Sequence, residues 1–350
     1  MREYGSEHHW QSRQGFEGVT RRREIYAWRF YRSGRDALKQ VARLHRGATV
    51  LLPALCCESM ILPFTLNGCP VAFYKLKPDL TGDEADVLSK AAPGTVLLYM
   101  PYFDVQPFTG DFLSRLRQSG VILLEDRTQD IIVGRPAAFL PDYTVASIRK
   151  WAALPEGGIL KTAAVLPRVA ADSRFGALRR QAMEEKGTYL ENGDAELKQD
   201  FLEKFHEAEA LLDESGQPVS MSMENRAYME NIDFALVLSA RRRNAAVLER
   251  ALEALTAAGT IRPLCKSETT AGLYYPILLE NRDAVQQALA RRNIYCPVIW
   301  PIPAQAQGIC ENSETTAAHI LALPCDQRYT ERDMLHIAEE LKTILTQTGE

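Results

Sequence analysis

Residues 146–151 read Ala-Ser-Ile-Arg-Lys-Trp, and the turn-forming sequence Pro-Glu-Gly-Gly follows at residues 155–158. The apolar stretch 143–147 runs directly into this segment and has the composition of a buried strand. Lys150 therefore follows a predicted strand and precedes a turn. Taken alone, a lysine beside an arginine is ordinarily a surface residue, so its meaning depends on the sequence around it.

Two upstream segments complete the pattern. The apolar run 121–124 ends in the carboxylates Glu125 and Asp126, and residues 33–38 read Ser-Gly-Arg-Asp-Ala-Leu, which is typical of a turn that opens a helix. The chain thus presents, in order, a small-residue helix start, a carboxylate after a strand, and Lys150. Each feature alone is weak evidence for a functional site, and it is their order along the chain that makes the combination informative.

Short apolar runs recur at intervals through the first half of the chain, with helix-like segments such as 111–118 between several of them. Near-continuous apolar strands separated by helices indicate an α/β fold with a mostly parallel sheet, covered on both faces. The predicted strands are 49–52, 70–74, 95–99, 121–124 and 143–147.

The second half is predicted to be helical from 174 to 213 and from 232 to 255, and then to alternate between strands and helices. We predict an N-terminal arm at residues 1–25, a large domain at 26–245 and a smaller C-terminal α+β domain at 246–350. In the arm, His8 and His9 are expected to be disordered. The later segments are strands at 273–278 and 294–299 and helices at 282–292 and 331–346.

Composition narrows the function. The chain has 350 residues, of which 46% are hydrophobic and 25% charged, with a net charge of −4. These values describe an ordinary globular protein and give no reason to expect nucleic acid or a membrane as partner. Seven cysteines without a paired spacing argue against a disulfide framework or a metal site and favour the cytoplasm.

The three segments supply what an enzyme of pyridoxal phosphate needs: an amine, an anion for the ring nitrogen and a phosphate cradle. Backbone N–H groups at the helix start near Gly34 would hold the phosphate, with help from Arg35. Asp126 should point into the ligand crevice of the sheet, with Glu125 as the neighbouring candidate. Lys150 would form the Schiff base and act as general base and acid.

These segments resemble the DegT/DnrJ/StrS-type aminotransferase family, in a divergent branch within fold type I of the pyridoxal phosphate enzymes. The resemblance runs from about residue 30 to the end and is expected to be most specific around 126–158. It is carried by Ser-Gly-Arg-Asp-Ala-Leu at 33–38, Leu-Pro-Ala-Leu-Cys-Cys at 52–57, Tyr-Phe-Asp at 102–104, Asp-Arg-Thr-Gln at 126–129, Arg-Lys through Pro-Glu-Gly-Gly at 149–158, and Leu-Pro-Cys-Asp-Gln-Arg-Tyr at 323–329.

The resemblance implies a role for each matched position. Lys150 would be the internal aldimine and Asp126 would face the pyridinium nitrogen. The remaining cofactor-binding residues would be Ser33, Gly34, Arg35 and Ser147 at the phosphate, Gln129 at the phenolic oxygen, and Cys57 or Tyr102 near the ring. The family further implies a homodimer and transfer of an amino group, typically from glutamate, to a keto-sugar nucleotide, as in polysaccharide biosynthesis.

This sequence also departs from the family pattern. Cys57 stands where an aromatic residue commonly covers the ring, and Asp104 replaces an expected glycine. Two other readings therefore stay open: a lyase, dehydratase or decarboxylase on the same scaffold, and a degenerate member that binds cofactor without turnover. A nucleotide-binding dehydrogenase is disfavoured because no Gly-x-Gly-x-x-Gly follows an early strand.

Overall fold

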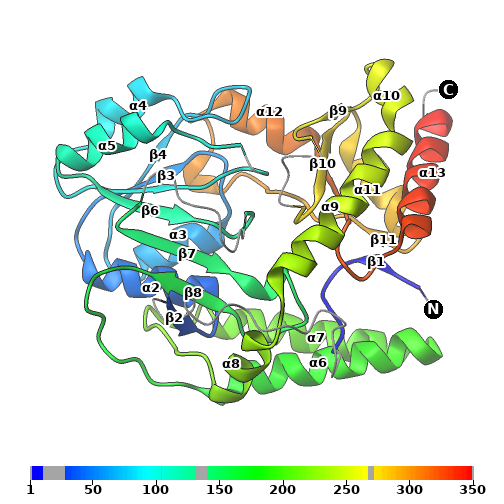
Figure 1. Ribbon diagram of the computed structural model, residues 1–350, viewed down its shortest axis with the longest axis horizontal. Helices are drawn as coiled ribbons and strands as arrows, with labels where there is room; N and C mark the ends of the chain where they lie inside the picture. The colour runs from blue at the N-terminus through cyan, green and yellow to red at the C-terminus, as the bar shows by residue number, and fades with distance from the viewer. Residues whose placement is uncertain (1, 11–27, 104, 131–139, 267–271, 349–350) are drawn as a thin grey trace.

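A seven-stranded sheet forms the centre of the computed structural model, which describes residues 2–10, 28–103, 105–130, 140–266 and 272–348 (Figure 1). The predicted α/β fold with a mostly parallel central sheet is confirmed. Across the sheet the strands are β2 (Trp28–Tyr31), β8 (Gly158–Lys161), β7 (Tyr143–Ser147), β6 (Ile122–Asp126), β5 (Val96–Tyr99), β3 (Val50–Pro53) and β4 (Val71–Tyr74).

The five parallel strands β3 to β7 are the five that the apolar runs predict. Parallel strands buried on both faces must be apolar throughout, so hydropathy reveals them. The two antiparallel strands were not predicted. β2 carries the partly exposed sequence Trp-Arg-Phe-Tyr, and β8 begins within the glycine pair that we read as a turn.

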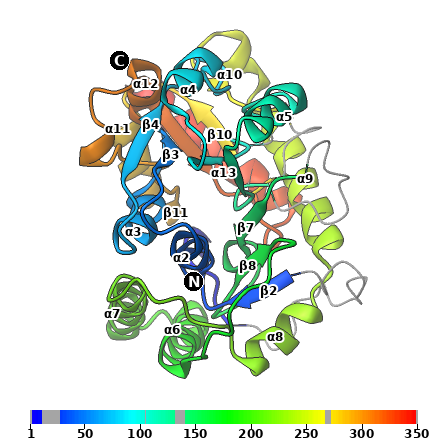
Figure 2. The same cartoon turned by 90° about the vertical axis from the view of Figure 1, so that its left-hand side faces the viewer.

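Helices cover both faces of this sheet. Figures 1 and 2 place α2 (Gly34–Leu44) and α3 (Glu58–Thr65) on one side and α4 (Glu84–Lys90) and α5 (Gly110–Gln118) on the other. The long helices α6 (Ser173–Asn192) and α7 (Ala195–Leu211) pack against each other and run along the lower edge of the molecule in Figure 1.

The C-terminal part has its own apolar core, built on a three-stranded antiparallel sheet of β12 (Ile320–Leu323), β10 (Tyr275–Leu278) and β9 (Arg262–Pro263). The predicted boundary at residue 245 falls inside the continuous helix α9 (Phe234–Ala251). The first half of that helix packs beside Trp151, and the second half packs into the C-terminal core. The other helices of this half are α8 (Met223–Glu230), α10 (Glu253–Ala257), α11 (Arg282–Ala290), α12 (Glu311–His319) and α13 (Glu331–Thr348).

The described part of the N-terminal arm is tied to the C-terminal part of the chain. Strand β1 (Tyr4–Gly5) pairs in parallel with β11 (Ile294–Tyr295), which is shorter than the predicted strand at 294–299. The expectation that His8 is disordered is wrong, because its side chain is only 8% exposed. Residues 11–25 of the arm lie outside the described residues.

None of the helices in the described ranges combines the length and the apolar character that a membrane crossing requires.

Candidate active site

The carboxyl ends of β6 and β7 meet at one edge of the sheet, and a cavity of about 560 Å³ opens beyond them. This volume lies within the range of roughly 300–1,000 Å³ typical of small-molecule sites. Seven of the nine predicted site residues line it: Gly34, Arg35, Cys57, Asp126, Gln129, Ser147 and Lys150. We call Gly34, Asp126, Gln129, Ser147 and Lys150 the strand-end wall.

Lys150 ends a short 3-10 turn (Ile148–Lys150) that follows β7 directly. Its side chain is exposed in the single chain, yet it lines the same cavity as Asp126, and its charge acts on that carboxylate. Its carbonyl oxygen accepts a hydrogen bond from Nη2 of Arg241 at 3.4 Å. The amine and the carboxylate therefore share one site, as the sequence predicts.

Asp126 is the last residue of β6, and 6% of its surface is exposed. Burial raises the pKa of its carboxyl group; a 2.8 Å hydrogen bond from the backbone N–H of Thr128 and the charge of Lys150 offset part of that rise. Glu125, the alternative candidate, pairs with β5, and it does not line the cavity. The buried Asp126 carboxylate is thus suited to a cationic ligand.

The remaining polar groups favour an anion at one end and a ring at the other. Gly34 opens α2 so close to Ser147 that a Cβ on Gly34 would lie 3.1 Å from the Cβ of Ser147. A glycine at this position lets a ligand come close to the backbone at the start of the helix, where N–H groups favour an anion. Gln129 is buried, and its Oε1 has no hydrogen-bond partner among the described residues.

Arg35 lines the cavity, but its guanidinium is also shared with acidic residues of α7. It lies 3.1 Å from Glu209 and 3.0 Å from Asp213. Glu209 additionally binds Arg149 at 2.7 Å and Arg179 at 3.0 Å. Although burial opposes it, the charges of the three arginines lower the pKa of Glu209 to about 2. Sequence reasoning missed this cluster because its carboxylates lie about 60 or more residues from Arg35 and Arg149.

Two predicted site residues do not line the cavity. Ser33 instead caps α2, where its hydroxyl accepts from the N–H of Asp36 at 3.2 Å. Tyr102 is fully buried, and its hydroxyl donates to the carbonyl of Leu55. The aromatic residues that line the cavity are Tyr274, Tyr295 and Trp300, and the ring centroid of Trp300 lies 6.3 Å from that of Tyr102. Asp104, which replaces the glycine expected from the family pattern, lies outside the described residues.

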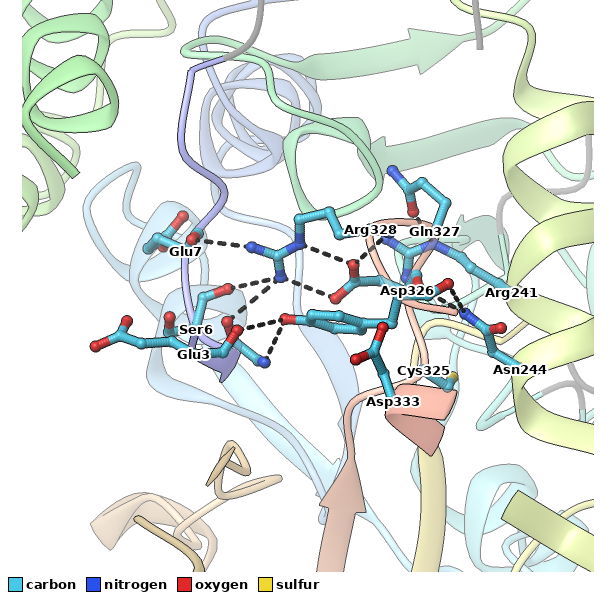
Figure 3. A network of polar contacts seen from close by, with 12 residues as sticks. Glu3, Ser6, Glu7, Arg241, Asn244, Cys325, Asp326, Gln327, Arg328 and Asp333 are labelled. Carbon is cyan, nitrogen blue, oxygen red and sulfur yellow. Dashed lines mark hydrogen bonds and ion pairs between the residues drawn. The ribbon is translucent and has the colours of Figure 1, made fainter. Parts of the chain in front are cut away.

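A second group of cavity residues comes from segments far apart in the sequence (Figure 3). Arg241 of α9 is buried, and it donates to the carbonyl of Trp151 at 3.1 Å and to that of Leu273 at 3.1 Å. Arg328 pairs with Asp326 through two 2.8 Å contacts and also reaches the N-terminal segment. The segment 323–329 was singled out in the sequence. Arg241 belongs to the basic run 241–243, which reads in the sequence as a solvated helix face, but the structure buries its side chain.

The residues present fit pyridoxal phosphate. The unpartnered Oε1 of Gln129, the close approach at Gly34 and the raised pKa of Asp126 are three independent features of an incomplete site. A phosphate at the helix start, a ring beside Gln129 and a ring nitrogen at Asp126 would complete all three. Lys150 supplies the amine that such a cofactor requires.

Comparison with known families identifies one match. The model of the DegT/DnrJ/EryC1/StrS aminotransferase family matches residues 226–342. This range holds Arg241 and Arg328 but neither Asp126 nor Lys150, although we expected the resemblance to be most specific around 126–158. A search of curated protein sequences gives no match.

Solved structures with the same fold extend over nearly the whole chain. Spr1654 from Streptococcus pneumoniae, assigned as a sugar aminotransferase and solved in its pyridoxal phosphate form, has a TM-score of 0.66 and 14% identity, covering 97% of this chain and 93% of its own. The aminotransferase TlmJ from Streptoalloteichus hindustanus has a TM-score of 0.65 and 16% identity, with coverage of 95% and 93%.

DesI, solved in the presence of its TDP-sugar product, has a TM-score of 0.67 and 19% identity, covering 95% of this chain and 83% of its own. At these identities the likeness establishes the fold. The chain therefore has the fold of the fold type I sugar aminotransferases, and its predicted resemblance to the DegT/DnrJ/EryC1/StrS aminotransferase family is confirmed, with a family-model match over residues 226–342.

Proposed function

We propose that this protein is a pyridoxal phosphate-dependent aminotransferase that uses Lys150. The observation that carries the proposal is the shared cavity of Lys150 and the buried Asp126, at the carboxyl edge of a parallel sheet. The net reaction exchanges the amino group of a donor for the keto oxygen of an acceptor. When bound, the cofactor supplies a reactive aldehyde and a ring that withdraws electrons.

In this proposal each residue of the site has a separate role toward the cofactor or the substrate. Asp126 holds a proton on the ring nitrogen by charge pairing, and Gln129 binds the phenolic oxygen with its side-chain amide. Gly34, Ser147 and Arg35 bind the phosphate. Nζ of Lys150 would take the proton from the α-carbon of the donor and would deliver it to the carbon that came from the aldehyde of the cofactor.

The proposal includes a homodimer with the sites at the subunit interface. Lys150 is exposed in the single chain, and a catalytic amine works in a site from which water is excluded. A second copy that covers this cavity would provide that exclusion.

For the reactants we propose an amino acid donor such as glutamate and a keto-sugar acceptor carried on a nucleotide. The fold shared with DesI, which was solved with a TDP-sugar product, supports the acceptor class. A role in polysaccharide biosynthesis follows from that class. Seven reduced cysteines suit the cytoplasm, which completes the proposal.

The test combines spectroscopy with peptide mapping. Purified protein loaded with pyridoxal phosphate should absorb in the visible range, and borohydride should fix the cofactor to the peptide that contains Lys150. Glutamate should convert the cofactor to its amine form, which a lyase would not accumulate. A colourless protein under excess cofactor, or label on another lysine, would contradict the proposal.

A further inference from the structure

The N-terminal residues form part of the cavity. The cavity that holds Lys150 and Asp126 is also lined by four residues more than 100 positions earlier in the sequence, namely Gly5, Ser6, Glu7 and His8. We call residues 5–8 the N-terminal wall. These residues add to the cavity a lining that does not come from the strand ends.

Arg328 fixes the backbone of this wall (Figure 3). Its Nη2 donates to the carbonyl oxygens of Gly5 at 3.4 Å and Ser6 at 3.3 Å, and its Nη1 donates to that of Glu7 at 3.3 Å. The paired carboxylate of Asp326 orients the guanidinium, with both of its oxygens at 2.8 Å. The three carbonyl contacts hold three consecutive residues in place.

Further contacts anchor the wall from other sides. Nζ of Lys186 donates to the hydroxyl of Ser6 and to the carbonyl of Glu7, both at 2.6 Å. The backbone N–H of Gly5 donates to the Tyr329 hydroxyl at 2.6 Å. Gly5 has a φ of +80° and approaches Tyr295 so closely that a Cβ would collide with its carbonyl oxygen. The wall is therefore a fixed part of the site.

His8 is the side chain that this wall leaves available. It lines the cavity, it is only 8% exposed, and its imidazole makes no hydrogen bond to any described residue. Burial, together with the charges of Arg328 and Arg241, lowers its pKa well below the usual 6.5, and Asp326 offsets this only in part. The ring therefore offers one hydrogen-bond donor and one acceptor to a ligand in the cavity.

We propose that His8 contacts the acceptor sugar, by hydrogen bonds between its neutral imidazole and hydroxyl groups of the hexose ring. This inference rests on the proposed aminotransferase function and names a residue that determines specificity within it. A neutral imidazole both donates and accepts, as a hydroxyl does, so the two are complementary.

The neighbouring charges favour a sugar over the carboxylates of an amino donor. A carboxylate requires available cationic donors, but Arg328 and Arg241 direct their N–H groups at protein oxygens. Nζ of Lys186 is similarly used by Ser6 and Glu7. The N-terminal wall thus presents a hydroxyl-binding group without a free positive charge.

The experiment compares His8→Leu, His8→Asn and a matched control, His9→Leu. His9 is the adjacent histidine, and it lines a separate, smaller cavity. Calorimetry on the full-length protein with bound cofactor measures the affinity of a TDP-linked amino hexose and of TDP alone. Stopped-flow absorbance measures the half-reaction with glutamate. Visible absorbance and borohydride labelling of Lys150 are recorded on every preparation.

We expect His8→Leu to weaken binding of the TDP-linked amino hexose by roughly 3- to 10-fold, the value of one or two neutral hydrogen bonds. Binding of TDP alone and the glutamate half-reaction should stay within about 2-fold of wild type, His8→Asn should recover part of the loss, and His9→Leu should match wild type.

Unchanged binding of the amino hexose in His8→Leu would overturn the inference, as would equal losses for TDP and the amino hexose, or for the glutamate step. Failure of the wild type to bind the amino hexose would overturn it together with the acceptor class. Because the Lys150 label is read separately, either failure is distinguishable from failure of the cofactor assignment.

Discussion

The cavity has two walls of different construction. The strand-end wall consists of residues that follow directly from neighbouring strands and one helix start, so the sheet itself positions them. The N-terminal wall is held by charged and hydrogen-bonded contacts between segments up to about 320 residues apart. Under the function that we propose, cofactor chemistry lies on the sheet scaffold, and substrate recognition lies on a surface assembled from distant segments.

Because the two walls are held by different contacts, residues of the N-terminal wall can be changed while the strand-end wall stays intact. Strand ends can change little without disturbing the parallel sheet, whereas residues 5–8 depend on a few side chains such as Arg328 and Lys186. Substitutions should therefore separate the two walls: damage to the strand-end wall should abolish chemistry, and damage to the N-terminal wall should alter affinity for one substrate.

The largest effect is expected from Lys150→Ala. Loss of the amine should reduce turnover on the order of 10⁴-fold or more and remove the borohydride-fixed label from its peptide. Lys161→Ala, which changes an exposed lysine at the end of β8, is the matched control and should keep both. Labelling at an unchanged level in Lys150→Ala would show that the strand-end wall does not hold the reactive amine.

Asp126→Asn should reduce turnover by roughly 10²- to 10⁴-fold, since the amide cannot hold the ring nitrogen protonated. The same change should stabilise the cofactor-free protein at pH 7, with a melting temperature higher by about 2 °C. The sign follows from the raised pKa of Asp126 in the folded state. Below the pKa of the unfolded chain, near 3.8, the carboxyl group is protonated in both states and does not lower the free energy of unfolding. As the pH rises to and through the higher pKa of the folded state, the buried charge lowers the free energy of unfolding.

Thermal unfolding with and without cofactor, at pH 4 and pH 7, measures this difference. The stabilisation should shrink at the lower pH and reverse when the cofactor is bound. A variant that is less stable than wild type without cofactor at pH 7 would mean that Asp126 already has a satisfying partner in the chain.

Arg328→Lys should have a smaller effect, confined to the N-terminal wall. Lysine retains the charge but cannot bind Asp326 bidentately while it donates to three carbonyls. We expect an approximately 10-fold fall in kcat/KM for the keto acceptor, faster hydrogen exchange of residues 2–10, and an unchanged Lys150 label. A matching loss in the glutamate half-reaction would show that the two walls are not independent.

The smallest effect on turnover is expected from Glu209→Gln, which should instead lower the free energy of unfolding. Three arginines lose their shared carboxylate, and a loss of about 2 kcal/mol at pH 7 is expected for this partly exposed group. Because the folded pKa is about 2, the contribution of Glu209 is present above its unfolded value near 4.5 and is lost as pH falls toward 2. Denaturant unfolding at pH 7 and pH 3 should show the difference between variant and wild type narrowing; a constant difference would contradict this account.

The sequence predicted the strand-end wall because its signals are local. A buried parallel strand is an apolar run, and the residue that follows it points into the crevice, so Asp126, Ser147 and Lys150 are found by reading along the chain. The prediction for Tyr102 also rested on a local motif, but the structure buries that ring, and Trp300 lines the cavity instead.

The other residues of the cavity could not be predicted from local sequence patterns. Arg241 carries no motif, and its role follows only from the way α9 crosses beside the loop after Lys150. His8 lies in a polar segment without periodicity, and the backbone carbonyls of the three residues before it are held by Arg328, more than 300 residues away in sequence. Charged networks of this kind depend on tertiary distance, which hydropathy and spacing do not encode.

The pairing of β1 with β11 bears on how the protein is made. Residues 4–5 are translated long before residues 294–295, the strand with which they pair. The parallel sheet and its strand ends can assemble while the C-terminal part is still being translated. The N-terminal wall cannot be completed before residues 294–295 and Arg328 have been synthesised, so a product that terminates before them lacks the surface that we propose selects the acceptor.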